Sequence, residues 1–326
     1  MNVRPTYSDI LAAAARLRGV SRLTPLLAGT ALDELAEGRI LLKLEPLQVT
    51  GSFKVRGAHN ALDSIEAGQR SAGVVAFSSG NHAQGVAWAA RRLGMPAAIV
   101  MPADAPQMKL DNTRALGAEV ITYDRLTGSR EAIASALAVE RGARLVPSFD
   151  DPQVIAGQGT VGLELMSQAR ELGLVPDQVL VCCSGGGLVS GCAIAIREAA
   201  PGCRIYTVEP EGHDDARRSL ASGQRERNAA GGSSLCDALL EPSPGELTFP
   251  IMRSLLAGGL VVSDREVLAA VAWAWRELKL VVEPGGAVGL AAVLAGRIDC
   301  RDRVTAVVIS GGNVDPATFA QALALA

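Results

Sequence analysis

Short, uninterrupted apolar runs alternate along the chain with longer segments in which apolar residues recur at helical spacing. The apolar runs predict strands at about 40–45, 73–78, 97–101, 119–123, 179–182, 204–208 and 304–309. The helical spacing predicts helices at about 8–18, 52–67, 82–94, 106–116 and 128–141. Strands that are apolar throughout are buried on both faces, so this alternation predicts an α/β fold of open, mostly parallel sheets flanked by helices.

The length of 326 residues suggests two domains or one large bilobal domain. The strands and helices within 73–148 are expected to form a small domain, and residues 1–72 and 149–326 together a large one. Residues 222–247 are rich in glycine, serine and proline and lack a regular pattern. We expect them to form a long loop at the surface or beside an active site.

The composition narrows the class of protein. Apolar residues make up 48% and charged residues 20%, and the net charge of −3 gives no sign of a nucleic-acid or anionic-membrane partner. The six cysteines show no CxxC spacing, which is typical of buried thiols in a reducing compartment. Because no signal region and no apolar run of membrane-spanning length is found, we expect a cytoplasmic protein.

Three loops of unusual composition follow predicted strands, at 78–82, 184–187 and 310–313. Ligands of open parallel sheets bind beyond the carboxyl ends of the strands, so these loops are expected at one site. The glycines of the second loop precede a predicted helix and are typical of a phosphate cradle made from backbone N–H groups. The loop matches neither the Walker nor the dinucleotide motif, and a tight turn without a ligand is the alternative.

The first loop reads Ser-Ser-Gly-Asn-His and offers hydroxyl, amide and backbone donors at a helix start, which suits a carboxylate. Ordinary N-capping by serine or asparagine is the alternative, and His82 suits a structural role better than a catalytic one. Ser310 ends the last predicted strand, where its hydroxyl could meet a heteroaromatic nitrogen.

Lys54 follows the predicted strand at 40–45 and lies in the first turn of the predicted helix at 52–67, in the run Gly-Ser-Phe-Lys-Val-Arg-Gly at 51–57. The first turn of a helix is electropositive, which disfavours an ammonium and lowers its pKa. A neutral amine can form a Schiff base with a carbonyl compound. The alternative is an ordinary solvated lysine.

A Schiff-base lysine, a phosphate cradle, a carboxylate-binding loop and a hydroxyl for a ring nitrogen are the parts of a pyridoxal-phosphate site. Four motifs are specific: Ser-Phe-Lys-Val-Arg-Gly at 52–57, Ser-Ser-Gly-Asn-His-Ala-Gln at 78–84, Val-Ile-Ala-Gly-Gln-Gly-Thr at 154–160 and Ser-Gly-Gly-Asn at 310–313. From Thr24 to Asp315 the chain resembles the threonine dehydratase and serine racemase group of pyridoxal-phosphate enzymes, with the tryptophan-synthase-β-like fold. Cysteine-synthase-type relatives fit less well.

The resemblance implies a role for each matching residue. Lys54 would hold the cofactor as a Schiff base and remove the Cα proton, Phe53 would stack beside the pyridine ring, and Asn81 would bind the 3′-oxygen. Ser310 would bind the pyridine nitrogen without keeping it protonated, which favours β-elimination. The loop that binds the cofactor phosphate would consist of Ser184, Gly185, Gly186, Gly187 and Leu188.

The resemblance also implies an amino-acid substrate. Its carboxylate would be framed by Ser78, Ser79, Asn81 and His82. Ser79 would lie on the face opposite Lys54, where racemases of the group exchange a proton, although many dehydratases keep this serine. Arg130 matches an arginine near the substrate pocket that could receive a second carboxylate, as in 3-hydroxyaspartate; a helix-surface arginine is the alternative.

A divalent cation is a further implication of the resemblance. The carboxylates of Glu209 and Asp215 and the carbonyl of His213 would hold it. Oxygen ligands of this kind suit Mg²⁺ or Ca²⁺. A solvated acidic turn is the alternative.

Two positions depart from the pattern of the group. Ser184 stands where many relatives have glycine and adds a hydroxyl near the phosphate. Ala238, in Leu-Cys-Asp-Ala, stands where relatives commonly have the glycine of Ala-Asp-Gly, and its methyl group would reshape a segment that faces the substrate. Because the chain ends soon after the last predicted helix, we expect no regulatory domain and no control by isoleucine.

From the resemblance we expect a dehydratase that converts L-threonine or L-serine to a 2-oxo acid and ammonia by β-elimination. It is expected to be a homodimer whose small domain closes over the substrate. An amino-acid racemase or a 3-hydroxyaspartate dehydratase on the same scaffold is one alternative. A non-catalytic protein that binds pyridoxal phosphate or another metabolite is the other, although a binding module has no need of the full set of site residues.

Overall fold

The computed structural model describes residues 3–78, 80–105, 107–124, 127–229 and 231–325. Its strands are β1 (Leu26–Leu27), β2 (Arg39–Leu44), β3 (Val74–Phe77), β4 (Ala97–Pro102), β5 (Glu119–Tyr123), β6 (Arg144–Leu145), β7 (Gln178–Cys182), β8 (Arg204–Pro210), β9 (Gly258–Val262) and β10 (Val304–Ile309). Its α-helices are α1 (Tyr7–Leu17), α2 (Ala31–Leu35), α3 (Lys54–Asp63), α4 (Asn81–Leu93), α5 (Gln107–Ala115), α6 (Arg130–Arg141), α7 (Pro152–Glu171), α8 (Gly187–Ala199), α9 (Asp215–Ser222), α10 (Thr248–Leu255), α11 (Asp264–Trp273), α12 (Pro284–Leu294) and α13 (Pro316–Leu323). Single turns of other helix types are η1 (Glu45–Leu47), η2 (Ala67–Ala72), η3 (Asp237–Leu239) and η4 (Ala274–Leu278).

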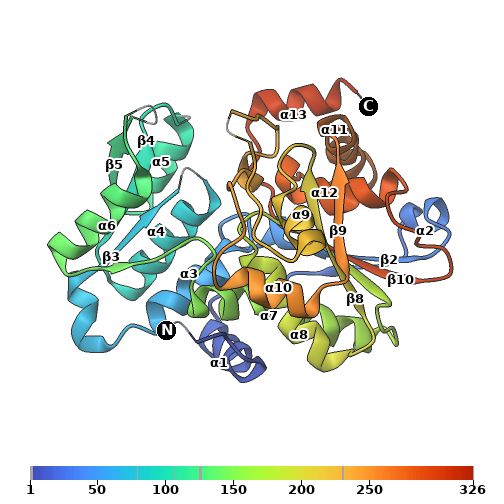
Figure 1. Cartoon of the computed structure of the whole chain (residues 1–326), viewed down its shortest axis with the longest axis horizontal. Helices are drawn as coiled ribbons and strands as arrows, with labels where there is room; N and C mark the ends of the chain where they lie inside the picture. Colours follow the sequence, from blue (N-terminus) through green and yellow to red (C-terminus); the bar gives the residue numbers. More distant parts are fainter. Residues whose placement is uncertain (1–2, 79, 106, 125–126, 230, 326) are drawn as a thin grey trace.

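Within these residues the strands form two sheets that lie side by side (Figure 1). The larger sheet has the order β1-β2-β10-β7-β8-β9 and the smaller one β5-β4-β3-β6. Neighbouring strands are parallel throughout, apart from the antiparallel β1–β2 pair. The predicted α/β class, with open and mostly parallel sheets flanked by helices, is confirmed.

The smaller sheet is covered on both faces, because successive side chains of a strand point in opposite directions. In β3, Val74 and Ala76 pack into one buried cluster with α4, whereas Val75 packs into another with α6. Helix α3 contributes Ala58 and Leu62 to the first of these clusters. The apolar run of β3 therefore fills two separate cores.

Helix α3 also packs closely against α7, through a contact that depends on glycine. A Cβ added at Gly57 would lie 2.4 Å from Nε2 of Gln158, and one at Gly157 would lie 2.6 Å from the carbonyl oxygen of Arg56. Contacts this short leave no room for a side chain. Helix α3 thus packs on the smaller sheet and on a helix of the larger one.

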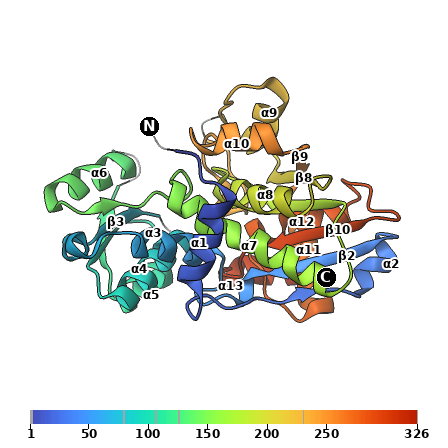
Figure 2. The same cartoon turned by 90° about the horizontal axis from the view of Figure 1, so that it is seen from below.

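The larger sheet is enclosed by helices α7 and α8 on one side and by α11, α12 and α13 on the other (Figures 1 and 2). Helix α1 lies against α7, as Figure 2 shows from below. In the described part of the chain, no helix is both long and apolar enough to cross a membrane.

A buried ionic network fixes the start of α3. Arg56 donates to both oxygens of Glu45 at 2.9 Å and to both oxygens of Glu164 at 2.7 and 2.8 Å. Lys43 also donates to Glu164, at 2.7 Å, and the Thr24 hydroxyl donates to Glu45 at 2.6 Å. Burial opposes the Glu45 charge, but the Arg56 guanidinium holds the Glu45 pKa below its ordinary value. Two cations and two carboxylates thus balance each other inside the fold.

Replacing Arg56 by methionine should destabilise the protein strongly. Glu45 has 0% exposure and would remain buried without its main cationic partner. Loss of one partner of a buried pair costs about 3–5 kcal/mol, and we expect a decrease of that size in the free energy of unfolding measured with urea.

The matched control is Arg39→Met, because Arg39 is 54% exposed and pairs with Asp33 at the surface. Exposed pairs contribute about 0–1 kcal/mol, so this variant should stay close to wild type. An equal decrease in the free energy of unfolding of the two variants would show that the buried network stabilises the protein no more than a surface ion pair does.

Candidate active site

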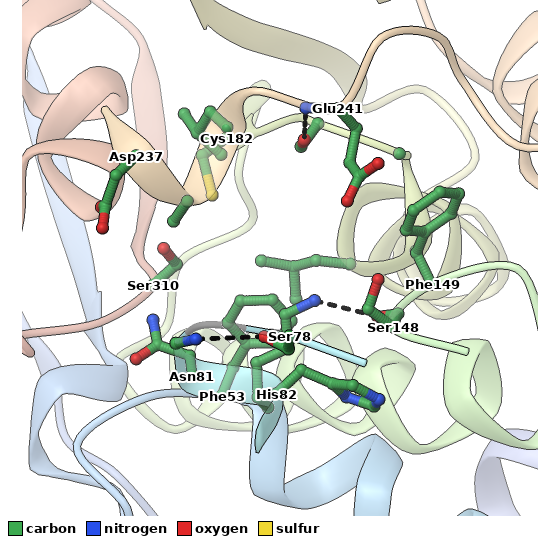
Figure 3. A pocket seen from close by; sticks show the side chains of 18 of the residues that line it. Phe53, Ser78, Asn81, His82, Ser148, Phe149, Cys182, Asp237, Glu241 and Ser310 are labelled. Carbon is green, nitrogen blue, oxygen red and sulfur yellow. Dashed lines mark hydrogen bonds between the residues drawn. The ribbon is translucent and has the colours of Figure 1, made fainter. Parts of the chain in front are cut away.

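A cavity lies where the loops after β2, β3, β7 and β10 meet, beyond the carboxyl ends of these parallel strands (Figure 3). The described residues of the predicted site that line it are Phe53, Lys54, Ser78, Asn81, His82, Arg130, Ser184, Gly185, Gly186, Gly187, Leu188, Ala238 and Ser310. Ser79 lies outside the described residues. The structure therefore brings together side chains that are distant in sequence, as expected for ligand sites of parallel sheets.

Lys54 is the first residue of α3 and points into this cavity. Its Nζ donates to the carbonyl oxygen of Ser148 at 2.9 Å and lies 5.3 Å from the centre of the Phe53 ring. Removal of the ammonium from bulk water lowers the Lys54 pKa to about 8, and the negative charge of Glu241 opposes this shift. The sequence argument ascribed a lowered pKa to the helix terminus, whereas burial is the main cause in the structure.

The glycine loop after β7 leaves its backbone open to the cavity. Helix α8 begins at Gly187, and its N-cap residue Gly186 has φ +94° and provides no side-chain cap. A Cβ at Gly185 would lie 2.4 Å from the ring of Phe149, so this position excludes other residues. The first N–H groups of such a helix are available to an anion, which fits the phosphate of pyridoxal phosphate.

Asn81 begins α4 and is held by a chain of polar contacts. Its Nδ2 donates to Oε1 of Glu283 at 2.7 Å, and its Oδ1 accepts from Nδ2 of Asn313 at 2.7 Å. Asn313 donates in addition to the carbonyl oxygen of Thr50 at 2.9 Å. An amide nitrogen has two hydrogens, so Glu283 fixes the direction of the Asn81 amide while using one of them.

His82 is buried in the first turn of α4. Its Nε2 lies 2.9 Å from the carbonyl oxygen of Val146, which requires the proton to be on Nε2. Burial, reinforced by the positive charge of Lys54, lowers the His82 pKa to about 3. The ring is therefore neutral at physiological pH and ties the start of α4 to the segment after β6.

Ser310 follows β10, and Cys182 ends the neighbouring strand β7. The Ser310 carbonyl oxygen accepts from the N–H of Phe53 at 3.1 Å, which connects this strand end to the Lys54 turn. Burial raises the Cys182 pKa to about 11, so its thiol stays protonated. The two side chains present neutral groups to the same part of the cavity (Figure 3).

Arg130 begins α6 and lies in the cavity rather than on the helix surface alone. Both oxygens of Glu241 accept from its Nη2, at 2.8 and 2.9 Å. Ala238, from the segment that departs from the pattern of the group, lines the cavity beside Gly285, where an added Cβ would lie 3.3 Å from the Ala238 methyl.

Several cavity residues were missed from the sequence. They are Lys109, Ser148, Phe149, Cys182, Leu239, Glu241 and Glu283. Glu283 had a usable signal, because it directly precedes Pro284 and two glycines at a helix start. Cys182 and Leu239 lie close to segments that the sequence singled out, at 184–187 and 235–238. The other four residues lie farther from such segments, and only the tertiary fold brings them to the cavity.

The residues predicted to bind a cation lie between the end of β8, which contains Glu209, and the start of α9 at Asp215. Both oxygens of Glu209 accept backbone N–H groups, from Ala216 at 2.8 Å and Arg217 at 2.7 Å. Burial and the nearby Asp215 raise the Glu209 pKa, and burial raises that of Asp215 to about 6. Asp215 Oδ2 is buried and has no hydrogen-bond partner among the described residues.

This arrangement fits a cation only in part. Two buried carboxylates with raised pKa values favour a positive ion between them, even though the charge of Arg218 offsets part of the shift at Asp215. Oxygen is the right donor for Mg²⁺ or Ca²⁺. No group of three or more His, Cys, Asp or Glu side chains in the described part of the chain is arranged to hold a metal. A cation here would need backbone oxygens as further ligands, as predicted for the His213 carbonyl.

The fold and cavity define an α/β protein with a buried lysine beside the open N-terminus of a helix. A family model for pyridoxal-phosphate dependent enzymes matches residues 17–311. The L-threo-3-hydroxyaspartate ammonia-lyase of Pseudomonas sp is 43% identical over 318 residues, covering 98% of each chain. This chain therefore belongs to the family of pyridoxal-phosphate dependent enzymes, in its group of ammonia-lyases and racemases.

Solved structures agree with this assignment. Maize serine racemase matches with a TM-score of 0.92 and 36% identity, covering 99% of this chain and 98% of that one. The threonine deaminase of T.th. matches with a TM-score of 0.89 and 45% identity, covering 95% of this chain and 99% of that one. The resemblance drawn from the sequence motifs is confirmed at the level of the family and fold.

The buried Glu283 should make stability depend on pH. Burial raises the Glu283 pKa from 4.5 to about 7, and the negative charge of Asp237 contributes to this rise. When an acidic group has a higher pKa in the folded than in the unfolded chain, the protein loses stability as the pH rises from the unfolded-state pKa to the folded-state pKa. We expect cofactor-free Glu283→Gln to match wild type near pH 4 and to exceed it near pH 8, by on the order of 3 kcal/mol in the free energy of unfolding.

Urea titrations at both pH values measure this difference. Glu246→Gln is the control, because the Glu246 side chain is 84% exposed, and this variant should follow wild type at both pH values. If the free energies of unfolding of Glu283→Gln and wild type differ by the same amount at both pH values, the raised pKa of Glu283 is contradicted.

Proposed function

We propose that this protein is a pyridoxal-phosphate-dependent ammonia-lyase that converts L-serine or L-threonine to a 2-oxo acid and ammonia. One observation carries the proposal: Lys54, with a pKa of about 8, lies in the same cavity as the open terminus of α8, Asn81 and Ser310. A lysine with this pKa is partly neutral near pH 7.5 and can act as a nucleophile and a base. A protein that only bound a metabolite would have no use for such a group.

Pyridoxal phosphate, when bound, supplies an electron sink for the carbon that loses its proton. The N–H groups at the start of α8 would hold its phosphate, and Asn81 and Ser310 would orient its ring. Lys54 would take up the Cα proton of the substrate, and the first turn of α4 would hold the substrate carboxylate. Because Ser310 and Cys182 are both neutral, nothing at that end of the ring would hold an additional proton.

L-threo-3-hydroxyaspartate is the second candidate substrate. Arg130 lies in the cavity, and the 43% identical relative is named as an ammonia-lyase for that amino acid. Racemisation of an amino acid is the third candidate activity, because maize serine racemase shares the fold at 36% identity. The elimination chemistry of the proposal is common to the first two candidates, which differ only in the β-substituent.

Release of 2-oxo acid from L-serine and L-threonine should depend on Lys54. In the presence of pyridoxal phosphate, Lys54→Ala should lower kcat by a factor of about 10²–10⁴ or more, because it lacks the proton acceptor. Borohydride reduction followed by mass spectrometry should attach the cofactor to the Lys54 peptide of the wild type and to no peptide of the variant.

Lys279→Ala is the matched control, since Lys279 is a surface residue outside the cavity. Wild-type protein that labels at Lys54 but releases no 2-oxo acid from L-serine or L-threonine would refute the lyase for these two substrates. Chiral analysis of the recovered substrate then identifies a racemase by the appearance of the D-enantiomer.

We also propose that Glu209 and Asp215 bind Mg²⁺ or Ca²⁺, with the His213 carbonyl as a further ligand. The support is the pair of buried carboxylates with raised pKa values and the unpartnered Oδ2 of Asp215. A bound cation would remove the repulsion between these groups. The closing motion of residues 73–148, the homodimer and the cytoplasmic location stay predictions.

Cation binding should appear as thermal stabilisation. A ligand at 100 times its Kd stabilises the folded state by about 2.7 kcal/mol, so saturating Mg²⁺ or Ca²⁺ should raise the Tm of wild type by several degrees. Asp215→Asn should abolish this rise. Asp214→Asn is the control, because Asp214 is bound to Arg217 and Arg218, and the rise should persist. An unchanged wild-type Tm after addition of either ion and after chelation would refute the site.

A further inference from the structure

Arg130 reaches the cavity with its charge already paired. Besides the two bonds from Nη2 to Glu241, its Nε donates to Glu131 at 2.8 Å. The guanidinium carbon lies 5.4 Å from the centre of the Phe77 ring. Two carboxylates therefore face one guanidinium, and these three groups together carry a net negative charge.

Glu241 is held in this position by its backbone. Its N–H donates to Oγ of Ser184 at 3.2 Å, and its carbonyl oxygen accepts from Nδ2 of Asn228 at 3.1 Å. Its side chain is 22% exposed and projects toward the cavity from the side opposite Asn81 and His82 (Figure 3). Because contacts on both sides fix the backbone, a ligand cannot displace Glu241 as a whole.

The described cavity lining holds three cationic side chains, Lys54, Arg130 and Lys109, and Lys109 is paired as well. Its Nζ lies 2.7 Å from Oδ2 of Asp237. Neither Lys109 nor Arg130 thus offers an unpaired positive charge to the side chain of a substrate. The carboxylate shared by all amino-acid substrates can instead be bound by the neutral donors at the start of α4.

We propose that Glu241 is a specificity-determining residue that makes the cavity select amino acids with an uncharged side chain and reject those with a second carboxylate. A second carboxylate that approached Arg130 would meet the negative charge of Glu241 at short range and would compete with it for one guanidinium. Repulsion of this kind in a partly desolvated site is an effective means of discrimination. The inference rests on the proposed function and ranks L-serine and L-threonine above L-threo-3-hydroxyaspartate.

The experiment compares the holoenzyme of wild type and Glu241→Gln on L-serine and L-threo-3-hydroxyaspartate. Wild type should show the higher kcat/KM with L-serine. The variant keeps the shape of the side chain without its charge, so the ratio of the two kcat/KM values should shift toward the dicarboxylate by about tenfold or more. Glu241→Ser serves the same purpose if circular dichroism shows that the glutamine variant is misfolded.

A binding measurement separates this proposal from the proposed function. Succinate has two carboxylates and no amine, so it reports on charge without any reaction, and calorimetry gives its Kd. Glu241→Gln should bind succinate about tenfold more tightly than wild type. Glu246→Gln is the matched control, since Glu246 lies in the same loop with its side chain 84% exposed, and it should change neither the succinate Kd nor the kcat/KM ratio.

Two results would overturn the proposal: a wild type that prefers L-threo-3-hydroxyaspartate, or a Glu241→Gln variant with an unchanged succinate Kd. If wild type releases 2-oxo acid from neither amino acid, the proposed function fails. The succinate titration still decides the role of Glu241 in that case, because tighter binding by the variant supports charge exclusion and equal binding refutes it.

Discussion

The buried pairing of Arg56 with Glu45 and Glu164 is the interaction on which the position of the site depends. Arg56 lies on the first turn of α3, Glu45 directly follows β2, and Glu164 belongs to α7. A bidentate guanidinium fixes direction as well as distance. The network therefore sets the angle at which α3 leaves the larger sheet, and with it the direction in which Lys54 enters the cavity.

The rest of the cavity follows from the parallel arrangement of the strands. The carboxyl ends of β7 and β10 in the larger sheet and of β3 in the smaller sheet face the same cavity, so the loops of Ser78, Ser184 and Ser310 converge although they are distant in sequence. Helices α4 and α8 begin at this cavity and present their N–H groups, which attract anions through backbone dipoles. The neutral donors at these helix starts suit a phosphate and a carboxylate. Lys54 is then not needed to bind either anion and would be available as the base of the proposed reaction.

The sequence predicted the parts that depend on local pattern: the alternation of strands and helices, the glycine loop and the lysine at a helix start. It did not predict β1, β6 and β9. Two residues make no pattern in β1 and β6, and β9 begins with two glycines, which weaken the signal of a strand. It also missed Glu241 and Glu283, whose partners Arg130 and Asn81 lie more than a hundred residues away. The lowered pKa of Lys54 was expected from the helix terminus, but its main cause is burial, which a sequence does not show.

One departure from the family pattern, Ser184, is physically connected to the pairing of Arg130 with Glu241. The hydroxyl of Ser184, where many relatives have glycine, accepts the N–H of Glu241 and thereby joins the phosphate-binding loop to the residue that neutralises Arg130. A glycine at position 184 would leave that N–H without this partner and the loop free to move. The arginine alone would then indicate a dicarboxylate substrate, whereas the arginine with its carboxylate partner indicates the opposite. The charge that a ligand meets is that of the pair, so a single matching residue does not transfer specificity from one relative to another.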